Sequence, residues 1–144
     1  MGRILGLDLG QSKTGIAVTD PTQTIVTPIA TVRSNDLHEL IQHIEIYIKE
    51  YNPELIVIGI PMSLSGKRGE MARWAQGIKN DLDSHFDLPF TTWDERLSTS
   101  TAKIIKDTNR SLPSINEEDA VAAAVILQGY LDHARFQNTP KGNI

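Results

Sequence analysis

The chain has 144 residues, the size of one ordinary domain, and its 40% hydrophobic and 22% charged residues exclude wholesale disorder. It has no cysteine, which excludes a disulfide scaffold, a cysteine-held zinc site or cluster, and a thiol nucleophile. The net charge of -4 argues against strong nonspecific binding of nucleic acid. No apolar run approaches the ~18–20 residues of a membrane span and the first residues do not resemble a signal peptide, so we expect a cytoplasmic protein without a membrane partner.

The first quarter of the chain predicts three antiparallel strands joined by short polar turns. Residues 4–9 are apolar on both sides of the pleat, as in a central buried strand. Residues 15–20 and 25–32 follow as the second and third strands, after turns at 10–15 and 21–24.

Helices and strands then alternate. A helix is predicted from an N-cap at Ser34 or Asn35 to Tyr51, where Pro53 ends it. After a strand at 55–60 and a loop at 62–68, the further elements are helices at 71–82, 98–105 and 116–131 and a strand at 90–93. Residues 136–144 lack periodicity, which predicts a single domain over 1–135 with a flexible tail.

This order predicts a mixed five-stranded sheet, three strands antiparallel and the others joined by α/β crossovers, with helices on both faces. Such a three-layer α/β/α arrangement resembles the ribonuclease H-like fold. Topology alone assigns no chemistry.

Carboxylates fall at three informative places. Asp8 interrupts an apolar strand, where an unpaired charge is costly, although it could also accept backbone bonds from the following turn. Asp94 and Glu95 end the last strand, at the edge where α/β sheets usually hold ligands, beside the strand that carries Asp8. Because side chains alternate along a strand, only one of the two can face Asp8. Either could instead act as a cap or form a salt bridge with Arg96. Asp119 opens the last helix, where the helix dipole alone favours acids, but the alanines that follow would let it approach the sheet.

Carboxylates from the first strand, the last strand and the last helix could therefore meet at one point. An all-oxygen set of this kind suits Mg²⁺ or Mn²⁺ rather than zinc. Two such ions ~3.5–4 Å apart can activate water and stabilise the leaving oxygen of a phosphodiester.

Several segments in the same order resemble the YqgF family, also called RuvX. They include Lys13-Thr14-Gly15, Asp94-Glu95-Arg96-x-x-Thr99 and Asp119-x-x-Ala122-Ala123-x-x-Ile126-Leu127-Gln128, and the resemblance runs from about residue 3 to 132. The resemblance implies a metal-dependent nuclease of the ribonuclease H-like fold, with catalytic and metal-binding residues at Asp8, Glu95 and Asp119. We would then expect Asp8 to bridge two Mg²⁺ or Mn²⁺ ions, with Glu95 and Asp119 each holding one flank.

The resemblance also implies residues that contact the substrate. These are Lys13, Lys67 and Arg68 in the loop at 66–69, Arg96 and Thr99. The implied activity is processing of the 5′ end of pre-16S rRNA, with structured RNA as the partner. The alternative is a Holliday junction resolvase acting on four-way DNA junctions, and the protein could be a monomer or a homodimer.

Two further alternatives remain open from the sequence. Residues 8–15 also resemble the first phosphate loop of actin-like ATPases, although those proteins close two such lobes over a nucleotide. The second alternative is a protein that keeps the fold and binds nucleic acid but has no catalytic activity.

Overall fold

A computed structural model of the chain describes residues 2–60, 66–94 and 118–138, with the side chains of 66–68, 118 and 135–138 outside that description. Its elements are β1 (Ile4–Leu9), β2 (Lys13–Thr19), β3 (Val26–Arg33), α1 (Leu37–Tyr51), β4 (Leu55–Ile60), α2 (Gly66–His85), β5 (Phe90–Asp94) and α4 (Glu118–Asn138).

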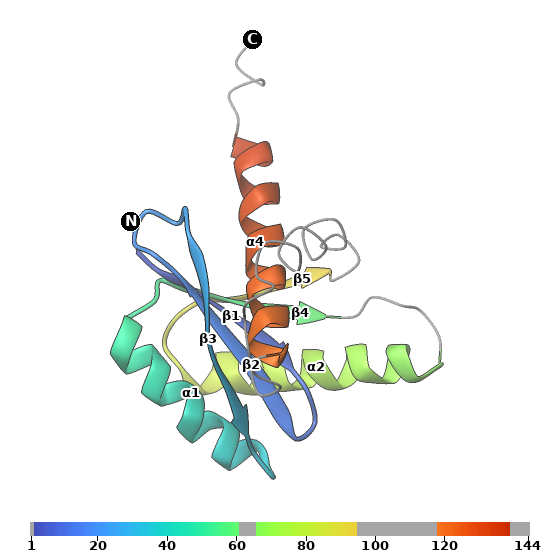
Figure 1. The fold of residues 1–144 in the computed structure, drawn as a ribbon. Coiled ribbons are helices and arrows are strands. Elements are labelled where there is room, and N and C mark those ends of the chain that lie inside the picture. Colours follow the sequence, from blue (N-terminus) through green and yellow to red (C-terminus); the bar gives the residue numbers. More distant parts are fainter. Residues whose placement is uncertain (1, 61–65, 95–117, 139–144) are drawn as a thin grey trace.

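The strands form one mixed five-stranded sheet in the order β3-β2-β1-β4-β5. β2 is antiparallel to both β1 and β3, whereas β4 is parallel to both β1 and β5. Figure 1 shows β1 in the middle of the sheet, as its apolar sequence predicted. The predicted mixed sheet is therefore confirmed.

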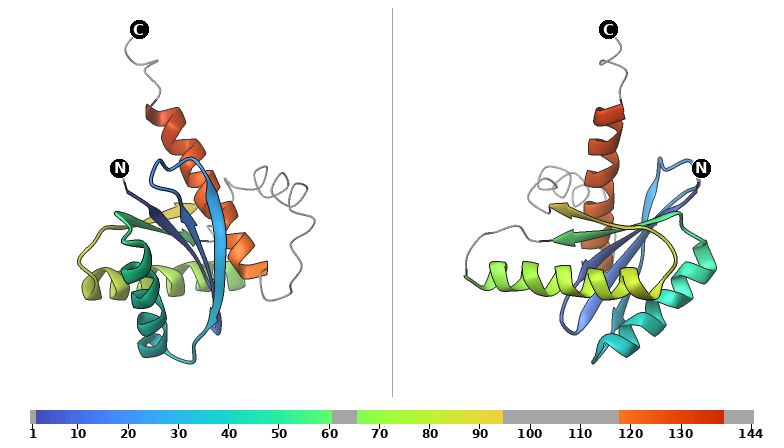
Figure 2. Two further views of the ribbon diagram at one scale, coloured as in Figure 1. Left: turned by 60° about the vertical axis from the view of Figure 1, so that its left-hand side comes forward. Right: turned by 180° about the vertical axis from the view of Figure 1, so that it is seen from behind.

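Helices cover both faces of the sheet, which gives three layers (Figure 2). Because strand side chains alternate, β1 feeds two separate cores. Leu5, Leu7 and Leu9 pack into the core beneath α1 and α2. Ile4 packs with α4 on the other face, so Gly6 and Asp8, which share its parity, lie on the α4 face.

The N-cap of helix α1 lies one residue after Asn35 and two after Ser34, the two predicted caps. This N-cap is Asp36, whose carboxylate accepts a 2.9 Å hydrogen bond from the backbone N–H of Glu39. The Glu39 carboxylate in turn accepts a 2.8 Å bond from the backbone N–H of Asn35. The N–H of Ser34 instead donates to the carbonyl of Ser12 at 3.1 Å, which ties the end of β3 to the turn before β2.

Other boundaries also differ from the prediction. β2 begins at Lys13 rather than at residue 15, and α2 begins at Gly66, so residues 66–68 belong to a helix rather than to the predicted loop. α4 continues through Asn138, so the segment from residue 136 to that point is helical rather than a tail. The helix predicted at 98–105 lies outside the described residues. Among the helices described, none has the length and apolar character needed to cross a membrane.

The turn between β2 and β3 is organised by the Asp20 carboxylate. It accepts hydrogen bonds from the backbone N–H groups of Ile25 (2.9 Å) and Thr24 (2.8 Å) and from the Thr22 hydroxyl. These bonds, with the Ile25 bond the largest cause, lower the pKa of Asp20 to about 2. Because the folded pKa lies below the unfolded one, their stabilisation is present above about pH 4 and is lost as the pH falls towards 2.

The C-cap of α1 gives a direct test of the fold at one residue. Asn52 is left-handed (φ 48°, ψ 58°), and its N–H donates to the carbonyl of Ile48 at 2.8 Å. We expect Asn52→Ala to lower the free energy of unfolding by about 1 kcal/mol, because a β-carbon is disfavoured in this conformation. Asn52→Gly should retain the parent stability in chemical denaturation. An alanine variant as stable as the glycine variant would contradict this cap.

Candidate functional site

Asp8 lies near the end of β1 between two residues that have no side chain. In the sheet register it is opposite Gly15 of β2 and Gly59 of β4. It is the one residue of β1 that is not fully buried. Side chains paired across strands share a face, so the α4 face beside Asp8 carries no side chain from either neighbour.

Helix α4 packs against these central strands at backbone distance. A β-carbon at Gly15 would overlap the carbonyl oxygen of Asp119, and one at Gly6 would lie 2.9 Å from Cβ of Leu127. On the helix, the buried Ala120 and Ala123 add little bulk at this contact. Small residues on both elements therefore allow the first turn of α4 to rest directly on β2.

This contact brings Asp8 and Asp119 to the same face and the same end of the sheet. Gly15 is the cross-strand partner of Asp8, and the backbone of Asp119 lies against Gly15. Within the described residues no group of three His, Cys, Asp or Glu side chains assembles, so these two carboxylates are what the structure describes of the predicted acidic set. Carboxylate oxygens of this kind are the ligands that a hard divalent cation prefers.

At the end of β5, the structure shows which face of the sheet Asp94 lies on, whereas the next residue, Glu95, is not described. Asp94 is paired with Ile60, which packs into the core beneath α1 and α2, so Asp94 lies on the face opposite Asp8. Glu95 lies outside the described residues. β4 lies between β1 and β5, so the last strand is not directly beside the strand that carries Asp8.

The predicted substrate-contacting residues are described only in part. Lys13 is the first residue of β2 and, two positions from Gly15, lies on the α4 face. Lys67 and Arg68 fall in the first turn of α2, without described side chains. Arg96 and Thr99 lie outside the described residues.

An open cavity of about 500 Å³ adjoins Asp119. We call it the β3 cavity; its lining residues are Lys13, Thr31, Val32, Arg33, His43, Tyr47 and Asp119. It extends from the first turn of α4 past the end of edge strand β3 to α1.

Sequence reasoning did not single out Arg33, because its position depends on an irregularity in β3. The β2–β3 register shifts at Ile16/Ala17, which leaves Ile29 as an extra residue. Without this bulge, Val32 would be opposite Lys13. Because of the bulge, Arg33 is opposite Lys13 and Val32 is buried in the core. The charge of Arg33 at the strand end was the only sequence signal.

Comparisons with known proteins agree with this architecture. The family model described as "RuvX: Holliday junction resolvase" matches residues 2–133. A protein of Pelagibacter ubique named "Putative pre-16S rRNA nuclease" is 37% identical over 133 residues, covering 90% of this chain and 87% of its own length. A protein of the same name from Sulfurihydrogenibium sp. is 34% identical and covers 96% of this chain and 95% of its own.

Solved structures show the same fold at low sequence identity. RuvC of Thermus thermophilus, in complex with a Holliday junction substrate, superposes with a TM-score of 0.70 at 11% identity, covering 94% of this chain and 96% of its own. The Fowlpox virus resolvase in complex with Holliday junction DNA has a TM-score of 0.52 at 13% identity, with 92% and 98% covered. Both support the ribonuclease H-like three-layer architecture.

The contact between Gly15 and Asp119 can be tested by adding one methyl group. We expect Gly15→Ala to lower the free energy of unfolding by about 1–3 kcal/mol, because the new methyl must displace the first turn of α4. Gly77→Ala in α2 is the matched control, since a β-carbon there meets nothing within 4 Å. That control should be stabilised by up to about 1 kcal/mol through helix propensity. Equal stability of both variants would contradict the packing of α4 on β2.

Proposed function

Since the chain belongs to the RuvX family, and is therefore a nuclease that hydrolyses ester bonds and has nucleic acid as its partner, we propose that it is a metal-dependent endonuclease that processes the 5′ end of pre-16S rRNA. The names of the curated relatives favour ribosomal RNA as the substrate. The single structural observation that supports a hydrolytic site is the approach of Asp119 to the strand pair that carries Asp8.

The donor chemistry of this region fits a divalent cation. Asp8 and Asp119 supply carboxylate oxygens, and Gly15 and Gly59 leave the face beside Asp8 free of strand side chains. Oxygen ligands of this kind select Mg²⁺ or Mn²⁺. We propose Glu95 as a further ligand, because it follows Asp94, which lies on the opposite face of the sheet.

In this proposal the carboxylates hold the metal and basic groups hold the substrate. When bound, the metal would lower the pKa of a water molecule and stabilise charge on the departing oxygen of the phosphodiester. Lys13, which lines the same cavity as Asp119, would hold a neighbouring phosphate. Lys67, Arg68, Arg96 and Thr99 are proposed as further substrate contacts.

A Holliday junction resolvase is the second candidate. The description of the matching family model favours it. Resolvases of four-way junctions commonly act as two-fold dimers that match a two-fold substrate. A monomer in solution would favour the RNA substrate, and a dimer with paired sites would favour the junction.

The Asp8→Asn variant tests the proposed acidic site. We expect the rate of metal-dependent cleavage to fall by at least about 100-fold. Mutation of a residue that only hydrogen-bonds to a metal ligand typically lowers activity by about 10–100-fold, and loss of a ligand should cost more. The variant should also lose the increase in thermal midpoint that Mg²⁺ causes in the parent, since a cation that binds only the folded state stabilises it. Cleavage assays and thermal unfolding with and without Mg²⁺ measure the two effects.

The matched control is Asp81→Asn. Asp81 is exposed on α2, near the end of that helix that leads into β5, and removing its charge should leave both readouts at parent values. Circular dichroism in EDTA confirms that both variants fold. An Asp8→Asn variant that cleaves as fast as the parent would show that the acidic site is wrong.

Substrate choice is tested with one panel of single-stranded RNA, pre-16S rRNA and four-way DNA junctions, each with Mg²⁺ or Mn²⁺. We expect cleavage of the ribosomal precursor, abolished in Asp8→Asn. Faster cleavage of the junction by a dimeric protein would replace the RNA assignment with the second candidate.

A further inference from the structure

We propose that the β3 cavity binds one unpaired nucleotide of the substrate strand, beside the phosphodiester that is cut. This inference rests on the proposed nuclease function and specifies how the substrate is held. The cavity includes Asp119, so its occupant would be next to the acidic site. Its volume of about 500 Å³ is within the range of small-ligand sites, roughly 300–1,000 Å³.

Two cations at the cavity are suited to a phosphate. Lys13 and Arg33 are directly opposite one another across β2 and β3, an arrangement that is destabilising for like charges. In the part of the chain that the structure describes, neither side chain takes part in a hydrogen bond or an ion pair. A phosphate group between them would relieve this repulsion and supply several acceptor oxygens.

The cation pair is held in place by the backbone. The β2–β3 ladder fixes both residues, and the 3.1 Å bond from the Ser34 N–H to the Ser12 carbonyl closes the end of the hairpin beside them. The backbone positions of both cations are therefore set before a phosphate binds, and only their side chains must become ordered around it.

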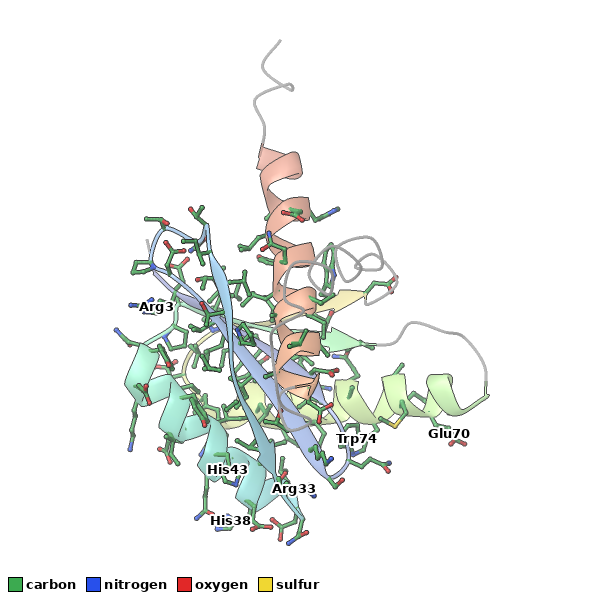
Figure 3. All side chains as sticks on the ribbon, viewed as in Figure 1. Arg3, Arg33, His38, His43, Glu70 and Trp74 are labelled. Carbon is green, nitrogen blue, oxygen red and sulfur yellow. The ribbon has the colours of Figure 1, made fainter. Side chains whose placement is uncertain are left out.

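Rings from α1 form the other side of the cavity. His43 and Tyr47 are four residues apart, so they share one helix face, and both are partly exposed. Figure 3 shows His43 of α1 close to Arg33 of β3. Neither ring makes a described aromatic contact, and a nucleic-acid base stacked on such a ring gains about 1–3 kcal/mol.

Thr31 also lines the cavity, but its hydroxyl is turned away from solvent. Thr31 Oγ1 is buried and, among the described residues, has no hydrogen-bond partner. The cations and the rings of the cavity together match the phosphate and the base of a nucleotide. A base can enter such a concave site only when it is not paired in a duplex, which makes a single-stranded segment the expected substrate.

The test measures binding of fluorescein-labelled RNA by anisotropy, in EDTA so that no cleavage occurs. The probes are a single strand of about 12 nucleotides, within the usual footprint of such sites, the matching RNA duplex, and an abasic strand of equal length. The variants are Arg33→Ala and His43→Ala. Their controls are Arg73→Ala, an exposed arginine on α2, and His38→Ala, an exposed histidine on α1 outside the cavity lining.

We expect Arg33→Ala to weaken binding of the single strand by about 10-fold and to reduce the salt slope by roughly one phosphate contact. His43→Ala should weaken binding of the same strand by at least about 5-fold, the loss of a stacked base, and should have no effect on the abasic strand. Both controls should bind within about twofold of the parent, since they remove no contact to a nucleotide.

Each other outcome overturns a defined part of the account. Unchanged binding by both cavity variants would exclude the cavity as a nucleotide site. Equal losses on single-stranded, duplex and abasic RNA would replace it with a contact to the phosphate backbone alone. Because binding is measured without metal, a parent that binds as expected but does not cleave would overturn the proposed function and leave the nucleotide site, without a cut beside it, standing.

Discussion

The candidate site depends on one close approach, in which the backbone of α4 lies directly on glycines of the two central strands. Gly15 has space only for hydrogen beneath the Asp119 carbonyl, and a β-carbon at Gly6 would lie 3.1 Å from the carbonyl oxygen of Ala123 and 2.9 Å from Cβ of Leu127. Since Gly15 is also the cross-strand partner of Asp8, the contact that packs the helix also sets the backbone of Asp119 against the strand pair that carries Asp8. The packing of α4 and the proposed acidic site therefore depend on the same few residues.

The sequence predicted the parts of this arrangement that depend on local pattern. An apolar run interrupted by Asp8 predicted a central strand with a functional acid, and the alanines after Asp119 predicted close packing of the last helix; the sheet and that packing are confirmed. The beginning of α2 was missed, because Gly66 and Gly69 are poor helix formers and the first apolar residue of the helix comes only at Met71. The N-cap was misplaced because several adjacent polar residues could each have capped α1.

Lys13 was named from the sequence, but its partner cation Arg33 could not be predicted, because the position of Arg33 depends on pairing between strands. One extra residue at Ile29 sets which of Val32 and Arg33 is opposite Lys13, and no local pattern marks that bulge. His43 and Tyr47 read as ordinary positions of an amphipathic helix, and only the tertiary structure places them around one cavity with Arg33. The roles of Asp8, Glu95 and Asp119 stay predictions, with Glu95 outside the described residues.

A crystal structure with Mn²⁺ bound tests the central claim most directly, because manganese accepts the oxygen ligands of a magnesium site and is located by its anomalous scattering. The account predicts an anomalous peak on the α4 face of the sheet, with carboxylate oxygens of both Asp8 and Asp119 at about 2.0–2.3 Å. A peak that contacts only one of these carboxylates, or a saturated crystal with manganese elsewhere and none between them, would contradict it.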